Sequence, residues 1–127
     1  MKKLTLLLLL MVSTNVMSEW KPIGFSDEQT QYVDLESIRK KGNKVKLWFL
    51  LDLKKVKIIE NKSILSIMGH EEYDCKEETT KVLDMFFYEG NMKNKEIFSE
   101  VNIHDEPTSI RPNTVESLNY KIACGKK

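Results

Sequence analysis

The sequence has little cysteine, little glycine and almost no net charge, and each shortage excludes a class of protein. Two cysteines among 127 residues allow only one disulfide pairing. The five glycines form no glycine-rich phosphate loop, and neither a Gly-x-Ser-x-Gly nor a His-Glu-x-x-His motif is present. The formal net charge of +1 is far from the strongly basic balance of a general nucleic-acid binder. We therefore expect a protein that is not an enzyme, with no cofactor and no nucleic-acid partner.

A single long apolar run, Leu4 to Val12, follows two lysines at the N-terminus. A basic start, a short apolar core and small residues after it are the three parts of a secretory signal peptide. The run is shorter than the roughly 20 residues of a membrane-spanning helix. The small residues Val16 and Ser18 predict cleavage after Ser18, so that residues 1–18 are a signal peptide and residues 19–127 form one domain. The alternative, an N-terminal core helix, has no amphipathic pattern to support it.

The rest of the chain predicts an exported protein that is not held in a membrane. No second long apolar run follows, and no cysteine lies near the expected cleavage site, so we expect neither a membrane span nor a lipid anchor. Without the signal peptide the chain keeps 18 basic and 19 acidic residues.

The two cysteines, Cys75 and Cys124, predict a disulfide, because an even count in an exported chain usually means a bridge. The bridge closes a loop of about 50 residues, for which the chain-entropy estimate is roughly 4 kcal/mol as an upper figure. The alternative is a catalytic thiol at Cys75 with His70 or His104 as its base. An oxidising compartment would consume such a thiol.

Alternating apolar residues predict mostly strands. The clearest runs from Lys44 to Leu53, where every second residue from Val45 onward is apolar. Its second face changes from lysines to Trp48 and Leu50, which predicts a helix packed over half of that face. The next segment, Lys54 to Glu60, either extends this strand or forms a loop. The remaining predicted strands are Trp20–Phe25 at a sheet edge, Gln31–Leu35, Ser63–Cys75, Thr79–Tyr88 and Glu96–Ile103, with turns at Asp34–Ile38 and Lys41–Asn43 and a loop at His104–Pro112.

The last element has helical spacing, with Val115, Leu118 and Ile122 on one face. Asn113 is the expected N-cap, with Glu116 completing a capping box, and Gly125 suits the C-terminal end. The predicted fold is α+β: a sheet of about five or six strands, with one C-terminal helix held on it by the disulfide. The free edge near Trp20 is open to pairing with a second copy, as in a homodimer.

Five features in order resemble the surface-adhesin protein E family of Gram-negative bacteria. They are Trp20, the Tyr32-x-Asp34 segment with Ser37-Ile38 after it, the Leu47–Asp52 strand, the Glu72–Cys75 segment, and a helix from Pro112 to Cys124. The resemblance implies that the five or six strands form an antiparallel β-sheet, with the C-terminal helix disulfide-linked to it. It also implies a place in the periplasm or on the outer-membrane surface of a Gram-negative bacterium, and adhesin-like binding of host matrix or serum proteins. One departure is the absence of a tryptophan from Asp105–Arg111, where the family commonly has one.

Charge is segregated along the chain. Residues 39–62 contain nine basic and two acidic residues, and residues 71–106 contain four basic and eleven acidic residues. If the basic residues gather on one surface, they form a patch for host proteins or for anionic partners such as heparan-type glycans, acidic protein segments or lipopolysaccharide phosphates. The alternatives are that the two regions neutralise each other or are simply solvated. The candidate patch is Arg39, Lys40, Lys41, Lys44, Lys46, Lys54, Lys55 and Lys57.

Other functions find less support. His70 and His104 each stand beside two acidic residues, but neighbours on a strand point to opposite faces, so we expect no metal site. A second candidate function is a periplasmic inhibitor or accessory module of the lysozyme-inhibitor type, with the His104–Arg111 loop entering an enzyme cleft. A small hydrolase would need convergent carboxylates in a cleft, and no motif marks them.

Overall fold

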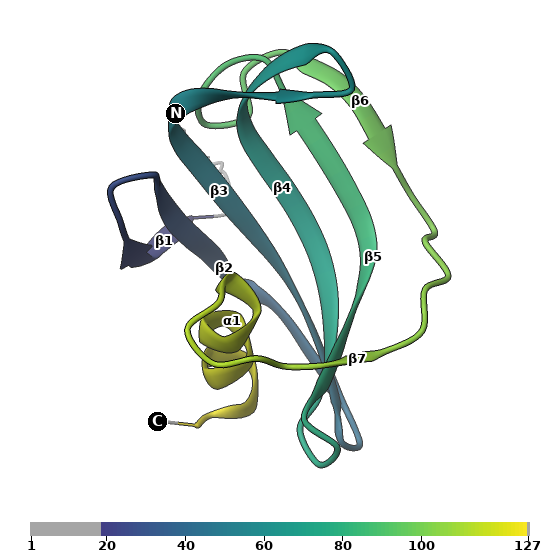
Figure 1. Cartoon of the computed structure of the whole chain (residues 1–127). Coiled ribbons are helices and arrows are strands. Elements are labelled where there is room, and N and C mark those ends of the chain that lie inside the picture. The colour runs from purple at the N-terminus through teal and green to yellow at the C-terminus, as the bar shows by residue number, and fades with distance from the viewer. Residues whose placement is uncertain (1–18, 127) are drawn as a thin grey trace, which may run out of the picture.

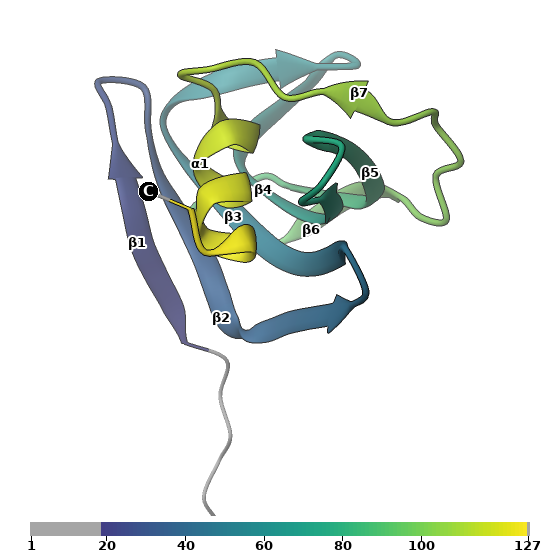
Figure 2. The same ribbon diagram turned by 90° about the horizontal axis from the view of Figure 1, so that it is seen from below.

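The computed structural model describes residues 19–126, in which one antiparallel sheet carries one helix on one of its faces (Figures 1 and 2). The sheet runs β1-β2-β3-β4-β5-β6 in chain order, and a short β7 also pairs with β5. This confirms the predicted fold class and the C-terminal helix. The elements are β1 (Trp20–Phe25), β2 (Gln29–Lys41), β3 (Lys44–Ile59), β4 (Lys62–Asp74), β5 (Thr79–Tyr88), β6 (Glu96–Glu100), β7 (Thr108–Ser109) and α1 (Val115–Cys124). The predicted signal peptide lies outside the described residues.

Tight turns let consecutive strands pair. Gly42 takes a left-handed φ of 63° between β2 and β3, as predicted for this turn. Glu60 and Asn61, with φ of 51° and 64°, join β3 to β4 as the two positive-φ residues of a hairpin turn. The segment after Leu53 therefore extends the strand, and β3 reaches Ile59.

The main core lies between the sheet and α1. Leu47 and Phe49 of β3 are buried with Val33, Tyr73 and Tyr120, which confirms the predicted inward face of β3. The Phe49 ring of β3 lies so close to the backbone of β4 that β4 needs a residue without a side chain at this point. A Cβ added to Gly69 would lie 2.5 Å from atoms of the Phe49 ring, so the glycine leaves room for the aromatic ring.

The prediction that a helix covers the second face of β3 is wrong, because α1 packs on the first face. The β5–β6 connection crosses the second face instead. Asn91 Nδ2 and the Met92 backbone N–H both donate to Asp52 Oδ1, at 3.1 and 2.8 Å. The Lys93 N–H donates to Ser66 Oγ at 3.0 Å. This loop explains how the second face becomes covered along its length.

The predicted turn at Asp34–Ile38 is an irregularity inside β2 and does not end the strand. The β2–β3 register shifts between Asp34 and Arg39. Within this stretch Asp34 Oδ1 accepts the Glu36 N–H at 3.1 Å, and Ser37 Oγ donates to the Asp34 carbonyl at 2.6 Å. Such short side-chain bonds compete with the ladder and bend the strand locally.

Two boundaries near the C-terminus differ from the prediction. β6 ends at Glu100, three residues before the predicted end at Ile103, and Val101 is 53% exposed. The helix is capped by Thr114, whose hydroxyl accepts the Ser117 N–H, while the Ser117 hydroxyl accepts the Thr114 N–H. Asn113 has a left-handed φ of 61°, whereas an N-cap needs extended backbone. Gly125 ends the helix as predicted, with φ of 67°.

Candidate functional site

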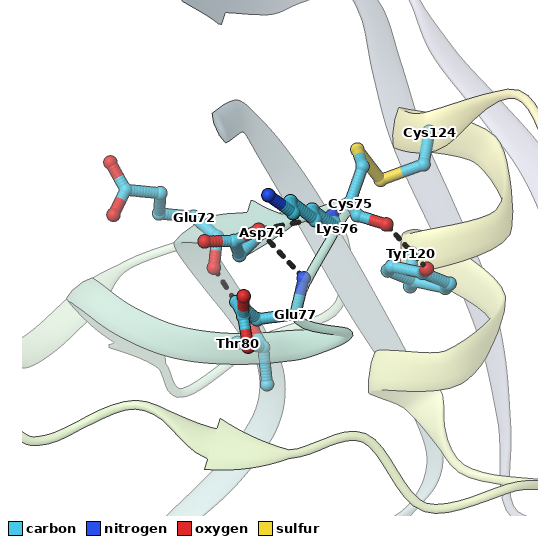
Figure 3. Close-up of a disulfide and its surroundings, with 8 residues drawn as sticks. All are labelled: Glu72, Asp74, Cys75, Lys76, Glu77, Thr80, Tyr120 and Cys124. Atoms are coloured by element: carbon cyan, nitrogen blue, oxygen red, sulfur yellow. Dashed lines mark hydrogen bonds between the residues drawn. A yellow bond between two sulfur atoms is a disulfide. The ribbon is translucent and has the colours of Figure 1, made fainter. Parts of the chain in front are cut away.

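The disulfide Cys75–Cys124 joins the turn after β4 to the last residue of α1, as predicted (Figure 3). The two Cα atoms are 5.7 Å apart. The Tyr120 hydroxyl, one turn earlier in α1, donates to the Cys75 carbonyl at 3.3 Å. On the other side the Cys75 N–H donates to the Asn43 carbonyl at 2.8 Å. The β2–β3 turn, the β4–β5 turn and the end of α1 are thus tied together, and we call this region the disulfide end. The thiol interpretation of Cys75 is wrong, because both sulfurs are in the bridge.

Local hydrogen bonds fix the β4–β5 turn. Asp74 Oδ1 accepts the backbone N–H groups of Lys76 and Glu77 at 3.0 and 2.9 Å (Figure 3). Thr80 Oγ1 donates to the Glu72 carbonyl at 3.2 Å. An aspartate that accepts N–H groups two and three residues ahead defines a tight turn. Cys75 is therefore held in place by its own turn as well as by the bridge.

A shallow hollow of about 410 Å³ lies at the disulfide end. Apolar side chains of β2, β3 and α1 line it, together with both cysteines and Lys40. This combination offers an apolar floor with a cation at its margin. The lining residues are Ile38, Lys40, Gly42, Asn43, Val45, Cys75, Ile122, Ala123, Cys124 and Gly125.

The eight basic residues predicted as one patch fall into two groups. Lys44 and Lys54 are separated by most of the length of β3, roughly 30 Å at the rise of a strand. The turns of the disulfide end and the far hairpin of β3 and β4 accordingly lie at opposite ends of the sheet (Figure 1). Five residues lie at the disulfide end and three at the far end: Arg39, Lys40, Lys41, Lys44 and Lys46, and then Lys54, Lys55 and Lys57.

None of these eight residues forms an ion pair with an acidic side chain within residues 19–126. Lys44 lies opposite Asp74, and Lys46 opposite Glu72, across the β3–β4 ladder. The Glu72 carboxylate, however, lies 3.9 Å from Lys81. All eight residues are exposed, and apart from Arg39 and Lys54, which donate to backbone carbonyls, their side chains remain available to an external anion.

The histidines give no metal centre. His70 Nδ1 lies 3.1 Å from Asp84 Oδ2, and its ring stacks on Trp48 at 4.3 Å. His104 lines the same open hollow as His70. Across residues 19–126 no three histidine, cysteine or acidic side chains converge as metal ligands. The stacked rings of Trp48 and His70 are cross-strand neighbours that pack against each other on the surface of the sheet.

A buried polar cluster lies under α1, and the sequence analysis missed it. Glu71 is 2% exposed and Asn119 is fully buried. The Tyr73 hydroxyl donates to Glu71 Oε1. Gln31 Nε2 donates to Asn119 Oδ1 at 2.9 Å and to the Val115 carbonyl at 3.0 Å. The signal was present in the sequence, since Glu71 shares the strand face of Ile67 and Tyr73.

Burial dominates the titration of this cluster. Loss of hydration, with a smaller contribution from the negative charge of Glu116, raises the pKa of Glu71 to about 7 against the opposing effect of the Tyr73 hydrogen bond. Burial and the adjacent Glu71 carboxyl raise the pKa of Tyr73 well above its usual range. Asn119 Nδ2 is buried and has no hydrogen-bond acceptor among the described residues.

Comparison with known proteins identifies the family. The profile described as Surface-adhesin protein E matches residues 20–125. The chain belongs to the surface-adhesin protein E family. No curated protein matches it in sequence. This family is one of adhesins rather than of enzymes, and membership supports export.

Solved structures of a family member share the fold. One structure of Haemophilus influenzae protein E has a TM-score of 0.59 and 17% identity, with 91% of each chain covered. A second crystal form of that protein gives 0.62 at 17% identity, covering 91% of this chain and 94% of the other. Protein E from non-typeable Haemophilus influenzae gives 0.58 at 17% identity, covering 91% and 82%. At this identity the likeness establishes the fold. No helix within residues 19–126 is long and apolar enough to cross a membrane.

Replacing both cysteines should destabilise this adhesin-family domain strongly. We expect Cys75→Ser with Cys124→Ser to lower the free energy of unfolding by up to about 4 kcal/mol, because a long loop regains its freedom in the unfolded chain. Urea unfolding followed by circular dichroism measures the change. Reducing agent should destabilise the parent protein equally and leave the double variant unaffected. A variant as stable as the parent would contradict a structural role for the bridge.

Glu71 should make stability depend on pH. A carboxyl with a raised pKa stabilises the fold fully below its unfolded pKa of 4.5, and this contribution is lost as pH rises to about 7. Glu71→Gln keeps an acceptor for Tyr73 but cannot ionise. We expect the variant to match the parent near pH 4.5 and to exceed it above pH 7 by up to about 3 kcal/mol. Urea unfolding across this pH range measures both. Glu72→Gln, on the opposite face of β4, is the matched control and should keep the pH dependence of the parent.

Proposed function

We propose that this protein is an exported, non-enzymatic adhesin of the bacterial envelope. It binds host matrix or serum proteins, or anionic glycans, through its disulfide end. The observation that carries the proposal is a set of five basic residues at the β2–β3 end of a cross-linked platform, where Lys40 lines an apolar hollow and Arg39, Lys41, Lys44 and Lys46 lie on the other face of the same strands. Membership of the surface-adhesin protein E family supports the binding role.

The chemistry of the disulfide end suits a macromolecular anion. Unpaired cations attract an anionic surface over a Debye length of about 10 Å and speed its encounter. Ile38, Val45 and Ile122 then offer apolar contact where the partner settles. The bridge and the Asp74 turn hold these groups in place before binding, which reduces the entropy lost on association.

The carboxyl of Glu71, whose pKa is shifted most, is better explained by a structural role than by catalysis. Glu71 has the raised pKa that general acids often show. It lies beneath α1 with only 2% of its surface exposed, so no substrate reaches it without displacing the helix. Its raised pKa therefore reflects the packing of α1, which supports a binding protein over a hydrolase.

Surface exposure tests the cellular part of the proposal. We expect protease or antibody added to intact cells to reach a tagged copy of the protein while a periplasmic marker stays protected. An adhesin has to meet its partner outside the outer membrane. Protection equal to that of the marker would contradict the adhesin role and favour a periplasmic partner.

Charge reversal tests the binding surface. We expect Lys40→Glu, Lys41→Glu and Lys44→Glu together to weaken binding to immobilised heparin and matrix proteins by at least roughly tenfold. The dependence of binding on salt should also flatten. Surface plasmon resonance at several salt concentrations measures both. The Lys54, Lys55 and Lys57 triple reversal, which the sequence alone predicts to weaken binding, carries the same change of charge at the other end of β3. Equal losses in the two variants would point to net charge in place of a defined surface.

A further inference from the structure

Helix α1 lies over a buried carboxyl on the inner face of the sheet (Figures 1 and 2). Glu71 of β4 is the cross-strand partner of Leu47 of β3, and Leu47 belongs to the core on which Tyr120 of α1 packs. The Glu71 side chain is 2% exposed. Strands β3 and β5 flank β4 on its two sides, so the shortest route for water to this carboxyl is through movement of the helix.

Few interactions hold the first half of α1, residues 115–119, on the sheet. Gln31 Nε2 donates to the Val115 carbonyl at 3.0 Å and to Asn119 Oδ1 at 2.9 Å. Within residues 19–126, both hydrogen bonds that join this half to a strand therefore come from one side chain. Val115 also packs against the core. The capping box of Thr114 and Ser117 lies within the helix end itself and adds no contact with the sheet.

Both flanks of this half are attached more firmly. Cys124 in the last turn is bonded to Cys75, and the Tyr120 hydroxyl donates to the Cys75 carbonyl at 3.3 Å (Figure 3). Before the helix, β7 pairs with β5, and the Ile110 N–H donates to the Glu78 carbonyl at 3.2 Å. The first half of α1 thus lies between two anchors that stay in place when it moves.

The groups that face the Glu71 carboxyl do not supply a positive charge. Its titratable neighbours are Tyr73 on the same strand and Glu116 on α1, while Thr80 of β5 and Asn119 of α1 present a hydroxyl and an amide. Asn119 Nδ2 has no acceptor in hydrogen-bond geometry. Across the described part of the chain, no lysine or arginine forms an ion pair with this carboxyl. Ionisation therefore favours a state in which water can hydrate it.

We propose that α1 is a pH-controlled lid on the inner face of the sheet. In mild acid the Glu71 carboxyl is protonated, and the first half of α1 stays packed on it. As the pH rises toward neutral, the carboxyl ionises more readily in the open form, where water hydrates it, and the open form gains population. The disulfide keeps the last turn in place throughout.

The raised pKa of Glu71 sets the pH range of this lid. Burial raises the pKa to about 7 in the closed form, whereas a hydrated carboxyl titrates near 4.5. Below pH 4.5 both forms are protonated, and opening does not depend on pH. Between these two values opening releases one proton, so the opening constant rises about tenfold per pH unit. Above pH 7 both forms are ionised and the constant levels off, after a total rise of roughly 300-fold.

Opening of the lid changes one surface and spares another. Leu47 and Phe49, which α1 covers, become accessible to solvent when its first half leaves the sheet. The hollow at the disulfide end stays formed, because Ile122 and Cys124 line it from the tied turn of the helix. The inference goes beyond the proposed adhesin function and does not depend on it. It also differs from the unfolding of the whole domain, because the sheet stays intact.

Hydrogen exchange followed by NMR tests the proposal on the protein with its disulfide intact. Protection factors from about pH 4 to about pH 8 give the opening constant at each amide, free of the intrinsic pH dependence of exchange. We expect the Leu118 and Asn119 amides to open at least roughly tenfold more often than the β3–β4 ladder at every pH. Their opening constant should rise about tenfold per pH unit until about pH 7 and then level off.

Three variants test whether Glu71 controls the lid. Glu71→Gln cannot ionise, so its α1 should open at every pH as rarely as the parent's does near pH 4.5. Glu116→Gln removes the negative charge that faces Glu71. We expect its opening constant to level off at a lower pH and to rise less in total than in the parent. Glu72→Gln, on the opposite face of β4, is the matched control and should follow the parent.

Several results would overturn the proposal. Equal opening of α1 and the β3–β4 ladder at every pH would mean that only the whole domain unfolds. A flat pH dependence in the parent, or the parent's dependence retained in Glu71→Gln, would remove Glu71 from control of the helix. If Glu71→Gln does not fold, an unchanged profile in Glu116→Gln would overturn it instead. Failure of the adhesin role would appear only in the heparin and matrix-protein assays, so the two proposals fail separately.

Discussion

The structure depends on the attachment of one short helix to a sheet. At ten residues, α1 is too short to be stable alone in water, so its conformation comes from what it packs against. Tyr120 joins the core of Leu47 and Phe49, and the bridge from Cys124 ties the end of the helix to the turn after β4. Without that attachment the inner face of the sheet would be open to water. The cross-link therefore maintains the core as well as the helix.

The buried polar cluster decides how the helix sits. Apolar packing is non-directional and tolerates sliding, whereas Gln31 must reach both Asn119 and the Val115 carbonyl, which allows one placement. Burying Glu71 costs free energy, which is why burial raises its pKa to about 7. That cost limits the stability of the domain at neutral pH. In return, hydrogen bonds rather than shape alone set the register of α1 on β2 and β4.

The sequence predicts those features that depend on local pattern. Alternation identifies the inner face of β3, and the cysteine count identifies the bridge. The face on which α1 packs was not predictable, because Trp48 and Leu50 carry the same apolar signal whether a helix or a loop covers them. The Asn91–Lys93 loop that does so is polar in sequence and is recognised only through its bonds to Asp52 and Ser66. Side-chain periodicity predicts that a strand face is covered, but only three-dimensional contacts show which element covers it.

The predicted basic patch also shows that local sequence pattern does not determine which residues lie together in space. The basic residues from Arg39 to Lys57 are close in sequence, which suggested a single patch. A strand rises about 3.3 Å per residue, so sixteen residues of β3 carry the charge from one end of the molecule to the other. Segregated charge along the chain thus becomes two separate clusters, each with its own neighbours. At the disulfide end one cation, Lys40, lines an apolar hollow, and at the far end the lysines alternate along β3 with exposed Val56 and Ile58. Because a bound anion is held by the charges and apolar groups within its own reach, the two ends are distinct in chemistry, and each has to be matched to a partner by itself.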